Sequence, residues 1–471
     1  MLANFRIEGD VYSIPRFDIE RTDIEGFINE LKVFHGKFRD CFYRVETKEK
    51  AFCYMVGQFS SLEKKNIESM ALEVEGADPR SMQRFISDAV WDEKKMVRNY
   101  HKMVADEMGD SSGVVIFDES GFAKKGNDSA GVSRQYCGSL GKVENCQVGV
   151  FAAYASKRGY CLLDKSLFMP EKWFTEDYAA RRKKCAVPED VTFRTKPQLA
   201  AEKLTSIHQE GTIPFTYIAA DSIYGNSPEF IQAADSCSGK IYFVAIPCDT
   251  RCWLKEPKTS TKKYQYRGEA HSKQLAENKP LSVKAIAKST HNYFWFRRRV
   301  SEGTKGPIEY EFTKKQVILC QDGLPAKSVW LVIKRTLGDN PIYYYYISNA
   351  PISTRLKTFV WLSGMRWAIE QCFEETKSEL GMDHCEIRKY SGWGHHILMC
   401  MLSHFFLWHL MITLGQRAPA ITLPQMRTLL EKVLPLRIFS IEDVIEKVRW
   451  IQKRNHLAFL AHKNKQVKLS L

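Results

Sequence analysis

The sequence predicts an α/β fold with a helical section before a central sheet and a β-rich insertion within it. Strand and helix patterns alternate over residues 111–248, which predicts the sheet and its covering helices. Strand patterns dominate residues 249–348, whereas apolar residues at helical spacing dominate residues 1–110. We expect residues 349–415 to complete the core that residues 111–248 begin, and residues 416–471 to form a helical C-terminal region.

Residues 1–110 are predicted to form short helices. Apolar side chains recur at helical spacing between Glu20 and Phe42, and Ser61 can begin a further helix. Asp78 followed by Pro79 is typical of an N-cap and the first helical residue. Arginine and lysine surround the apolar stripe behind this cap, which suits a DNA reader of the helix-turn-helix kind. A helical cap on the next domain would have the same pattern, so both interpretations are open.

Residues 111–248 are predicted to begin with strands and then to alternate strands with helices. A short apolar run, Gly113–Phe117, ends at Asp118, and two further runs flank the turn Lys157–Gly159, which predicts a hairpin. A helix over Pro197–His208 precedes the strand that ends before Asp221, and another helix and strand follow. A hairpin that leads into β-α-β-α-β is the order typical of a ribonuclease-H-like core.

The insertion, residues 249–348, carries most of the positive charge. From Arg251 to Lys315 there are sixteen Lys/Arg against six Glu and no Asp, within a chain of net charge +14, so nucleic acid is the favoured partner. Arg297, Arg298 and Arg299 follow a run of aromatic residues, and we expect them to contact backbone phosphate. Trp295 in that run can stack on an unpaired base, although a buried strand residue would give the same pattern.

A helix predicted over Trp361–Lys377 places unusual charges on one face. Arg366, Glu370 and Lys377 lie close together at 100° per residue, with Glu374 beside them. Ordinary ion pairs between residues four positions apart would explain this pattern without any function. The apolar stretch Ile397–Leu414 contains polar residues and is interpreted as a buried helix in preference to a membrane span.

Two acidic residues that follow strand-like runs change this interpretation. Asp118 and Asp221 each come directly after an apolar run, and ligand sites in α/β sheets gather at the carboxyl ends of strands. A turn or a helix cap would also explain each of them. Together with Glu370 they can converge on a divalent metal, because carboxylate oxygens are the ligands that Mg²⁺ prefers. Glu119, Glu374 and Glu375 are the neighbouring carboxylates that could be mistaken for the third ligand.

Composition points to a soluble intracellular protein. Hydrophobic residues make up 44% of the 471, enough for a real core. The thirteen cysteines show no CxxC pair and no zinc-type spacing, so a reducing compartment without structural disulfides is expected. The first eighteen residues lack a signal-peptide pattern, so we expect a cytoplasmic protein that acts at the nucleoid and not at a membrane.

Several motifs resemble those of the DDE transposases of bacterial insertion sequences, in particular the insertion-sequence-701 family, which is related to the group with a Y-R-E-K signature. The similarity extends from about Ser81 to Phe406. Its motifs are FDESGFAKKG at Phe117–Gly126, NCQVGVF at Asn145–Phe151, ADSIYG at Ala220–Gly225, and RWAIEQCFEETKSELGMDHCEIR at Arg366–Arg388. Arg366, Glu370 and Lys377 fall in register with Y-x2-R-x3-E-x6-K, but Ser363 stands at the position of the tyrosine.

The resemblance implies a ribonuclease-H-like core with a β-strand insertion and a catalytic triad of Asp118, Asp221 and Glu370. These carboxylates would hold two Mg²⁺ ions, for which Mn²⁺ can substitute, while Arg366 and Lys377 hold phosphate oxygens. The implied function is a transposase that binds the terminal inverted repeats of its own element and cuts and joins them to target DNA, as a homodimer that pairs two ends. A non-catalytic DNA-binding protein and a structure-specific nuclease are the alternatives.

Overall fold

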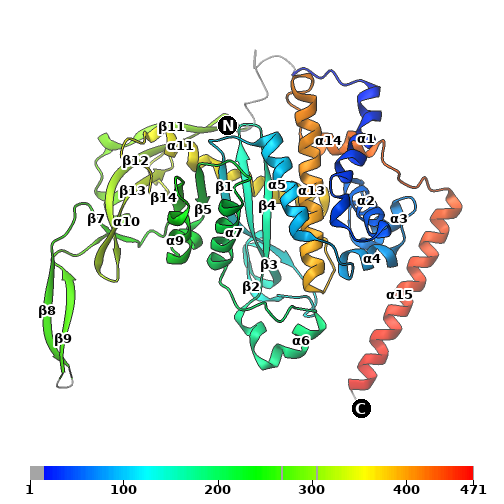
Figure 1. Ribbon diagram of the computed structural model, residues 1–471, viewed down its shortest axis with the longest axis horizontal. Helices are drawn as coiled ribbons and strands as arrows, with labels where there is room; N and C mark the ends of the chain where they lie inside the picture. The colour runs from blue at the N-terminus through cyan, green and yellow to red at the C-terminus, as the bar shows by residue number, and fades with distance from the viewer. Residues whose placement is uncertain (1–14, 267–268, 304–305, 470–471) are drawn as a thin grey trace.

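The computed structural model describes residues 15–266, 269–303 and 306–469. Arg267 and Lys305 of the basic insertion, and most of the segment inspected for a signal peptide, lie outside these residues. The architecture is mixed α/β, as the sequence predicts. Among the described residues, twelve strands form one large mixed sheet with helices packed against it (Figure 1).

Five helices precede the sheet: α1 (Arg21–Gly36), α2 (Val45–Phe59), α3 (Ile67–Glu73), α4 (Pro79–Ser87) and α5 (Glu93–Met108). The predicted cap of α4 is confirmed, because the Asp78 side chain accepts a hydrogen bond from the backbone N–H of Ser81. Helices α2, α4 and α5 pack against the long helix α13 (Tyr390–Leu414). This packing is what the helical-cap interpretation requires, and the DNA-reading role of these helices stays a prediction.

The core strands are β1 (Val114–Ala123), β2 (Ser133–Cys137), β3 (Lys142–Ser156), β4 (Gly159–Phe168), β5 (Tyr217–Ala220) and β6 (Ile241–Ala245). The helices between them are α6 (Ala179–Lys184), α7 (Lys196–Glu210), α8 (Ser222–Gly225) and α9 (Pro228–Ser236). Strand β3 pairs antiparallel with β1 and β4, which confirms the predicted hairpin, and β5 pairs parallel with β1 and β6. These five strands therefore lie in the order β4-β3-β1-β5-β6.

Strand β1 is longer than its apolar run predicts. Asp118 lies within it and not beyond its end, because pairing with β3 continues as far as Ala123. The parallel pairing with β5, however, stops at Phe117 and Ala220. Asp118 therefore stands where the neighbouring strand β5 ends, and ligand sites in α/β sheets gather at such strand ends.

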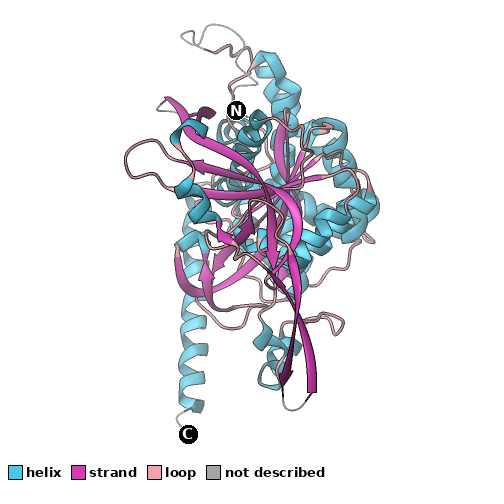
Figure 2. Ribbon diagram, turned by 90° about the vertical axis from the view of Figure 1, so that its left-hand side faces the viewer, coloured by secondary structure: helices cyan, strands magenta, loops and turns pink. Residues whose placement is uncertain are grey.

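The β-rich stretch extends the core sheet. It comprises β7 (Arg251–Trp253), β8 (Thr259–Tyr266), β9 (Glu269–Ala276), β10 (Leu281–Ser282), α10 (Val283–Ser289), β11 (Phe296–Gly303), β12 (Gly306–Gln321), β13 (Leu324–Arg335) and β14 (Tyr343–Ser348). Strand β14 pairs antiparallel with β6, and β13 and β12 follow, so the sheet runs on from the core (Figure 2). Strands β8 and β9 form a separate two-stranded ribbon that projects from the body (Figure 1).

The remaining helices are α11 (Leu356–Met365), α12 (Trp367–Leu380), α13, α14 (Leu423–Glu431) and α15 (Ile441–Leu469). The single helix predicted over Trp361–Lys377 is broken at Arg366, which lies between the last residue of α11 and the first residue of α12. Gly364, in the last turn of α11, has a low helix propensity. It also admits strand β11, because a Cβ at this position would lie 2.7 Å from the side chain of Val300.

Helix α13 is the core helix of the protein. Its length and composition alone would allow it to cross a membrane, but 83% of its most apolar window is buried inside the protein. The interpretation of this stretch as a buried helix is therefore confirmed.

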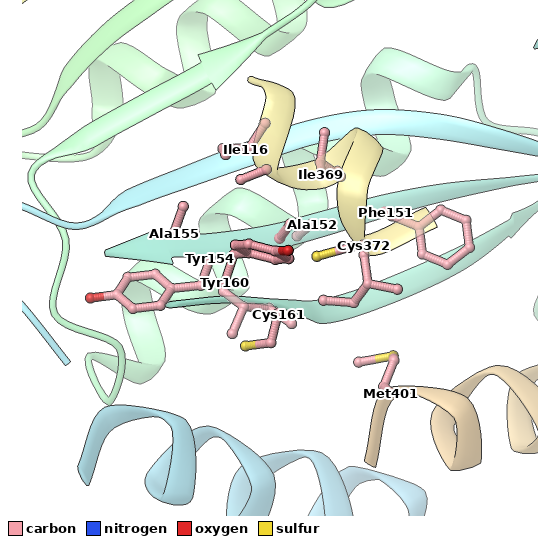
Figure 3. Close-up of a cluster of buried hydrophobic side chains, with 14 of the residues drawn as sticks. Ile116, Phe151, Ala152, Tyr154, Ala155, Tyr160, Cys161, Ile369, Cys372 and Met401 are labelled. Atoms are coloured by element: carbon pink, nitrogen blue, oxygen red, sulfur yellow. The ribbon is translucent and has the colours of Figure 1, made fainter. Parts of the chain in front are cut away.

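The core between the sheet and helices α12 and α13 fixes the rotation of α12 about its axis. Figure 3 shows this cluster, to which the helices contribute Ile369, Cys372 and Met401. The strands contribute Ile116, Phe151, Ala152, Tyr154, Ala155, Tyr160 and Cys161. Ile369 and Cys372 are fully buried, so their neighbour Glu370 is turned out of the core and is exposed.

Candidate active site

Two aspartates meet at the carboxyl end of β5. Asp118 projects from β1, and Asp221 directly follows β5, where its side chain accepts a hydrogen bond of 2.9 Å from the backbone N–H of Ile223 and caps α8. One carboxylate oxygen from each of Asp118, Asp221 and Glu119 lies within 4.8 Å of the others. Neighbouring strands thus bring together residues that are a hundred positions apart in the chain.

Burial and neighbouring negative charges raise the pKa values of both aspartates. Burial raises the pKa of Asp118 to about 7; Arg366 opposes this rise, whereas Asp221 and Glu119 add to it. Burial also raises the pKa of Asp221, with a further contribution from Glu119 and opposition from Arg366. A divalent cation among these oxygens would relieve the repulsion, so the set of donors fits a metal site.

Glu119 belongs to this cluster, whereas its sequence position predicts only a carboxylate that neighbours the site. Its Oε1 accepts a hydrogen bond of 3.0 Å from Lys196 Nζ, and its Oε2 accepts one of 3.0 Å from the Tyr224 hydroxyl. Tyr224 lies within the ADSIYG motif, and Lys196 begins α7. Neither contact could be read from the sequence, because each joins residues more than seventy positions apart.

Glu370 reaches the cluster through Arg366. The Nη2 atom of Arg366 lies 3.0 Å from Glu370 Oε1 and 3.6 Å from Asp118 Oδ2. Arg366 thus bridges the helix carboxylate and the strand carboxylate, while Glu370 itself stands outside the group of three that could share one ion. Glu374, one turn further along α12, is exposed, and Glu375 is buried, where it accepts hydrogen bonds from the Tyr160 hydroxyl and from His404.

The other two positions of the Y-R-E-K register contact the protein itself. Lys377 Nζ donates a hydrogen bond of 3.2 Å to the carbonyl oxygen of Gly121 and lies 5.4 Å from the centre of the Phe122 ring. This places its charge against β1, three residues beyond Asp118. The Ser363 hydroxyl donates to the carbonyl oxygen of Val360 within α11, so its hydrogen bond is local.

The basic run on β11 is exposed, and Trp295 is not. Arg297 forms an ion pair with Glu309 on β12, and Arg298 and Arg299 are also exposed. Trp295 is 7% exposed, its Nε1 donates to the Thr290 carbonyl, and Arg335 lies 4.1 Å from the centre of its ring. This burial fits the core interpretation that the sequence left open, and a stacking role for Trp295 stays a hypothesis. The exposed aromatic residues of the run are Tyr293, Phe294 and Phe296.

Sequence comparisons place this chain among known proteins. A family profile described as DDE superfamily endonuclease matches residues 37–307, a range that contains Asp118 and Asp221 but ends before Glu370. The chain is 25% identical over 344 residues to a protein of Microchaete diplosiphon named "Probable transposase for insertion sequence element IS701", and the match covers 72% of this chain and 77% of that protein. Among solved structures, a piggyBac transposase synaptic complex with hairpin DNA is similar to this chain with a TM-score of 0.40 and 8% sequence identity. The match covers 88% of this chain and 77% of the piggyBac chain.

Proposed function

This chain belongs to the DDE superfamily of endonucleases and is a transposase of that superfamily, and from this premise we propose that it cuts the ends of its own insertion sequence and joins them to target DNA with Asp118, Asp221 and Glu370 as its catalytic carboxylates. The observation that carries the proposal is the meeting of Asp118 and Asp221 at the end of β5, with Arg366 joining Glu370 to them. The strand order β4-β3-β1-β5-β6, with β5 and β6 parallel to β1, supports a ribonuclease-H-like core.

The carboxylates fit a divalent metal, and we propose Mg²⁺, in two ions, with Mn²⁺ as a substitute. When bound, the two ions activate a water or a 3′-hydroxyl as the nucleophile and stabilise the leaving oxygen. Asp118 and Asp221 would hold them from the sheet and Glu370 from α12. Arg366 lies between Asp118 and Glu370, and we propose that it binds an oxygen of the phosphate that is attacked.

Strand transfer is the reaction that separates this function from its alternatives. We expect the purified protein, with Mg²⁺ and the two ends of its element, to release those ends and join them to a target duplex. A structure-specific nuclease would cut without joining, and a non-catalytic binding protein would do neither. Either of these outcomes, in a preparation that binds the ends, would contradict the proposal.

Arginines of β11 are proposed to contact the DNA backbone. Replacing Arg297, Arg298 and Arg299 together with alanine should weaken binding to every sequence and should reduce the slope of log affinity against log salt, by about 0.9 for each duplex phosphate contact that is lost. Binding titrations over a range of salt concentrations measure this slope. An unchanged slope in the triple variant would assign these side chains to the solvated surface.

A homodimer is proposed to pair the two ends through helix α15. Figure 1 shows α15 extending away from the body. The helix meets the body through ion pairs of Lys447 with Glu73 and of Arg454 with Glu68. A second side of the helix carries an exposed apolar stripe at helical spacing, formed by Ile441, Val444, Ile445, Val448 and Phe459. A stripe of this kind on a long helix suits pairing with the same helix of a second copy, because a twofold interface uses one surface twice.

Substitutions that introduce negative charges into this apolar stripe should prevent dimer formation. We expect the double substitution Ile445→Glu and Val448→Glu to give a monomer that binds one end but does not pair two ends. Light scattering in the presence of the ends measures the mass. Leu457→Glu is the matched control, since Leu457 is exposed on the opposite side of the helix. If the double variant retains the mass of the unmodified protein, α15 is not the dimer contact.

A further inference from the structure

Lys334 of β13 is a buried cation that forms no ion pair with another described residue. The residue is 8% exposed, and among the described residues no carboxylate forms an ion pair with it and no oxygen accepts a hydrogen bond from it. Its Nζ lies 4.5 Å from the centre of the Tyr310 ring, 4.6 Å from that of Tyr344 and 5.8 Å from that of Tyr346. Strands β12 and β14 place these rings on the same face of the sheet as Lys334. Aromatic faces compensate only part of the cost of burying a charge.

The neighbouring cations do have partners. Arg335, on the opposite face of β13, forms an ion pair with Glu311. Lys314 lies 3.9 Å from the centre of the Trp330 ring, and its Nζ donates to the carbonyl oxygen of Thr354. Lys334 therefore differs from these two residues, because the contacts of its ammonium group with other described side chains are all with aromatic rings.

Lys334 also lies beside the active site. Lys334 lies opposite Tyr344 on β14. On the same strand, Tyr346 lies opposite Ala245 of β6, and the neighbouring Val244 lies opposite Ala220 of β5. Because Asp221 follows Ala220, Lys334 stands at the same edge of the sheet as the aspartates. Burial lowers the pKa of Lys334 to about 8, Arg366 lowers it further, and Glu370 raises it. The same two residues act on the Tyr346 hydroxyl, because burial raises its pKa, Arg366 opposes this rise and Glu370 adds to it. Tyr344 is 38% exposed, so the cluster extends to the protein surface at this ring. A second cation near Arg366, without an ion-pair partner among the described residues, is suited to an anionic ligand that reaches both.

We propose that Lys334, within its cluster of tyrosines, binds a backbone phosphate of the DNA strand that lies in the active site, next to the phosphate held by Arg366. This inference rests on the proposed function and deepens it, because it gives the β-rich stretch a direct part in the site. A lysine ammonium binds phosphate as a point charge, and the three rings shield part of the Lys334 ammonium from water. The Tyr310 and Tyr344 hydroxyls can donate to the same phosphate.

The test is DNA binding by Lys334→Met, which keeps the length of the side chain and removes its charge. The probe is a pre-cut duplex from the end of the element, titrated over a range of salt concentrations in Ca²⁺. We expect binding to weaken by about tenfold and the salt slope to fall by about 0.9. Lys334→Arg keeps the positive charge and should therefore keep most of the slope of log affinity against log salt. Lys314→Met is the matched control and should leave it unchanged.

Neutral methylphosphonates, placed one at a time along the probe, identify the contact. At one position the neutral group should weaken binding by the unmodified protein and have no further effect on Lys334→Met, because both changes remove the same interaction. Additive effects at every position, or an unchanged slope, would overturn the proposal. A lowered melting temperature with additive effects would assign Lys334 to folding alone. These readouts are independent of cleavage, so a failure of strand transfer by the unmodified protein would count against the proposed function and not against this contact.

Discussion

Replacing Asp118, Asp221 or Glu370 with alanine is expected to abolish DNA cleavage and to leave DNA binding nearly intact. Each substitution removes a carboxylate that the proposed metal ions need, and metal ions contribute several kcal/mol to such a reaction, so cleavage should fall by about a thousandfold or more. The basic surface is unchanged, and binding therefore survives. Cleavage of labelled ends and a binding titration on the same preparations measure the two effects. Asp118→Ala should also fold well, since burial and its acidic neighbours disfavour the ionised side chain.

Controls for this result come from the neighbouring carboxylates. Glu374→Ala changes an exposed residue one turn along α12 and should retain activity. If Glu374→Ala is inactive and Glu370→Ala cuts, the register of the helix has been assigned incorrectly. Glu119→Ala provides a second alternative, because Glu119 lies within the group of three carboxylates and Glu370 does not. Full loss in Glu119→Ala with activity kept in Glu370→Ala would make Glu119 the third ligand.

Gly225→Ala is expected to be the most damaging single-methyl change near the site. A Cβ at this position would lie 1.9 Å from the carbonyl oxygen of Ala245, a backbone atom of β6 that cannot turn aside as a side chain can. We expect a loss of about 3 kcal/mol or more in the free energy of unfolding, because the backbone of α8 or β6 has to shift. Helix α8 begins at Asp221, so the shift should also move that carboxylate and reduce cleavage by the folded fraction.

Denaturant unfolding measures the stability, and cleavage assays well below the melting temperature measure the second effect. Gly126→Ala is the matched control, since no atom lies within 4 Å of the added Cβ, and it should change neither quantity. A Gly225→Ala protein as stable as the unmodified one would mean that the close approach of α8 to β6 is not maintained in solution.

The sequence by itself determined the local elements and the family. The hairpin of β3 and β4, the cap of α4 by Asp78, the buried helix α13 and the motifs around Asp118, Asp221 and Arg366 could all be predicted, because periodicity, capping and motif spacing depend on residues close together in the chain. The predicted end of β1 was wrong, because the length of this strand depends on pairing with β3, which is distant in the chain, and not on its own apolar run.

Only the tertiary structure decided which side chains meet at the site. Glu119 joins the two aspartates, and Arg366 bridges Asp118 to Glu370. Strand pairing brings Lys334 of β13 to the same edge of the sheet. The burial of Trp295 beneath Arg335 was likewise open in the sequence. These positions depend on the register between strands and on the rotation of α12 against the core. Both are set by packing between residues far apart in the chain, and a local pattern carries no information about them.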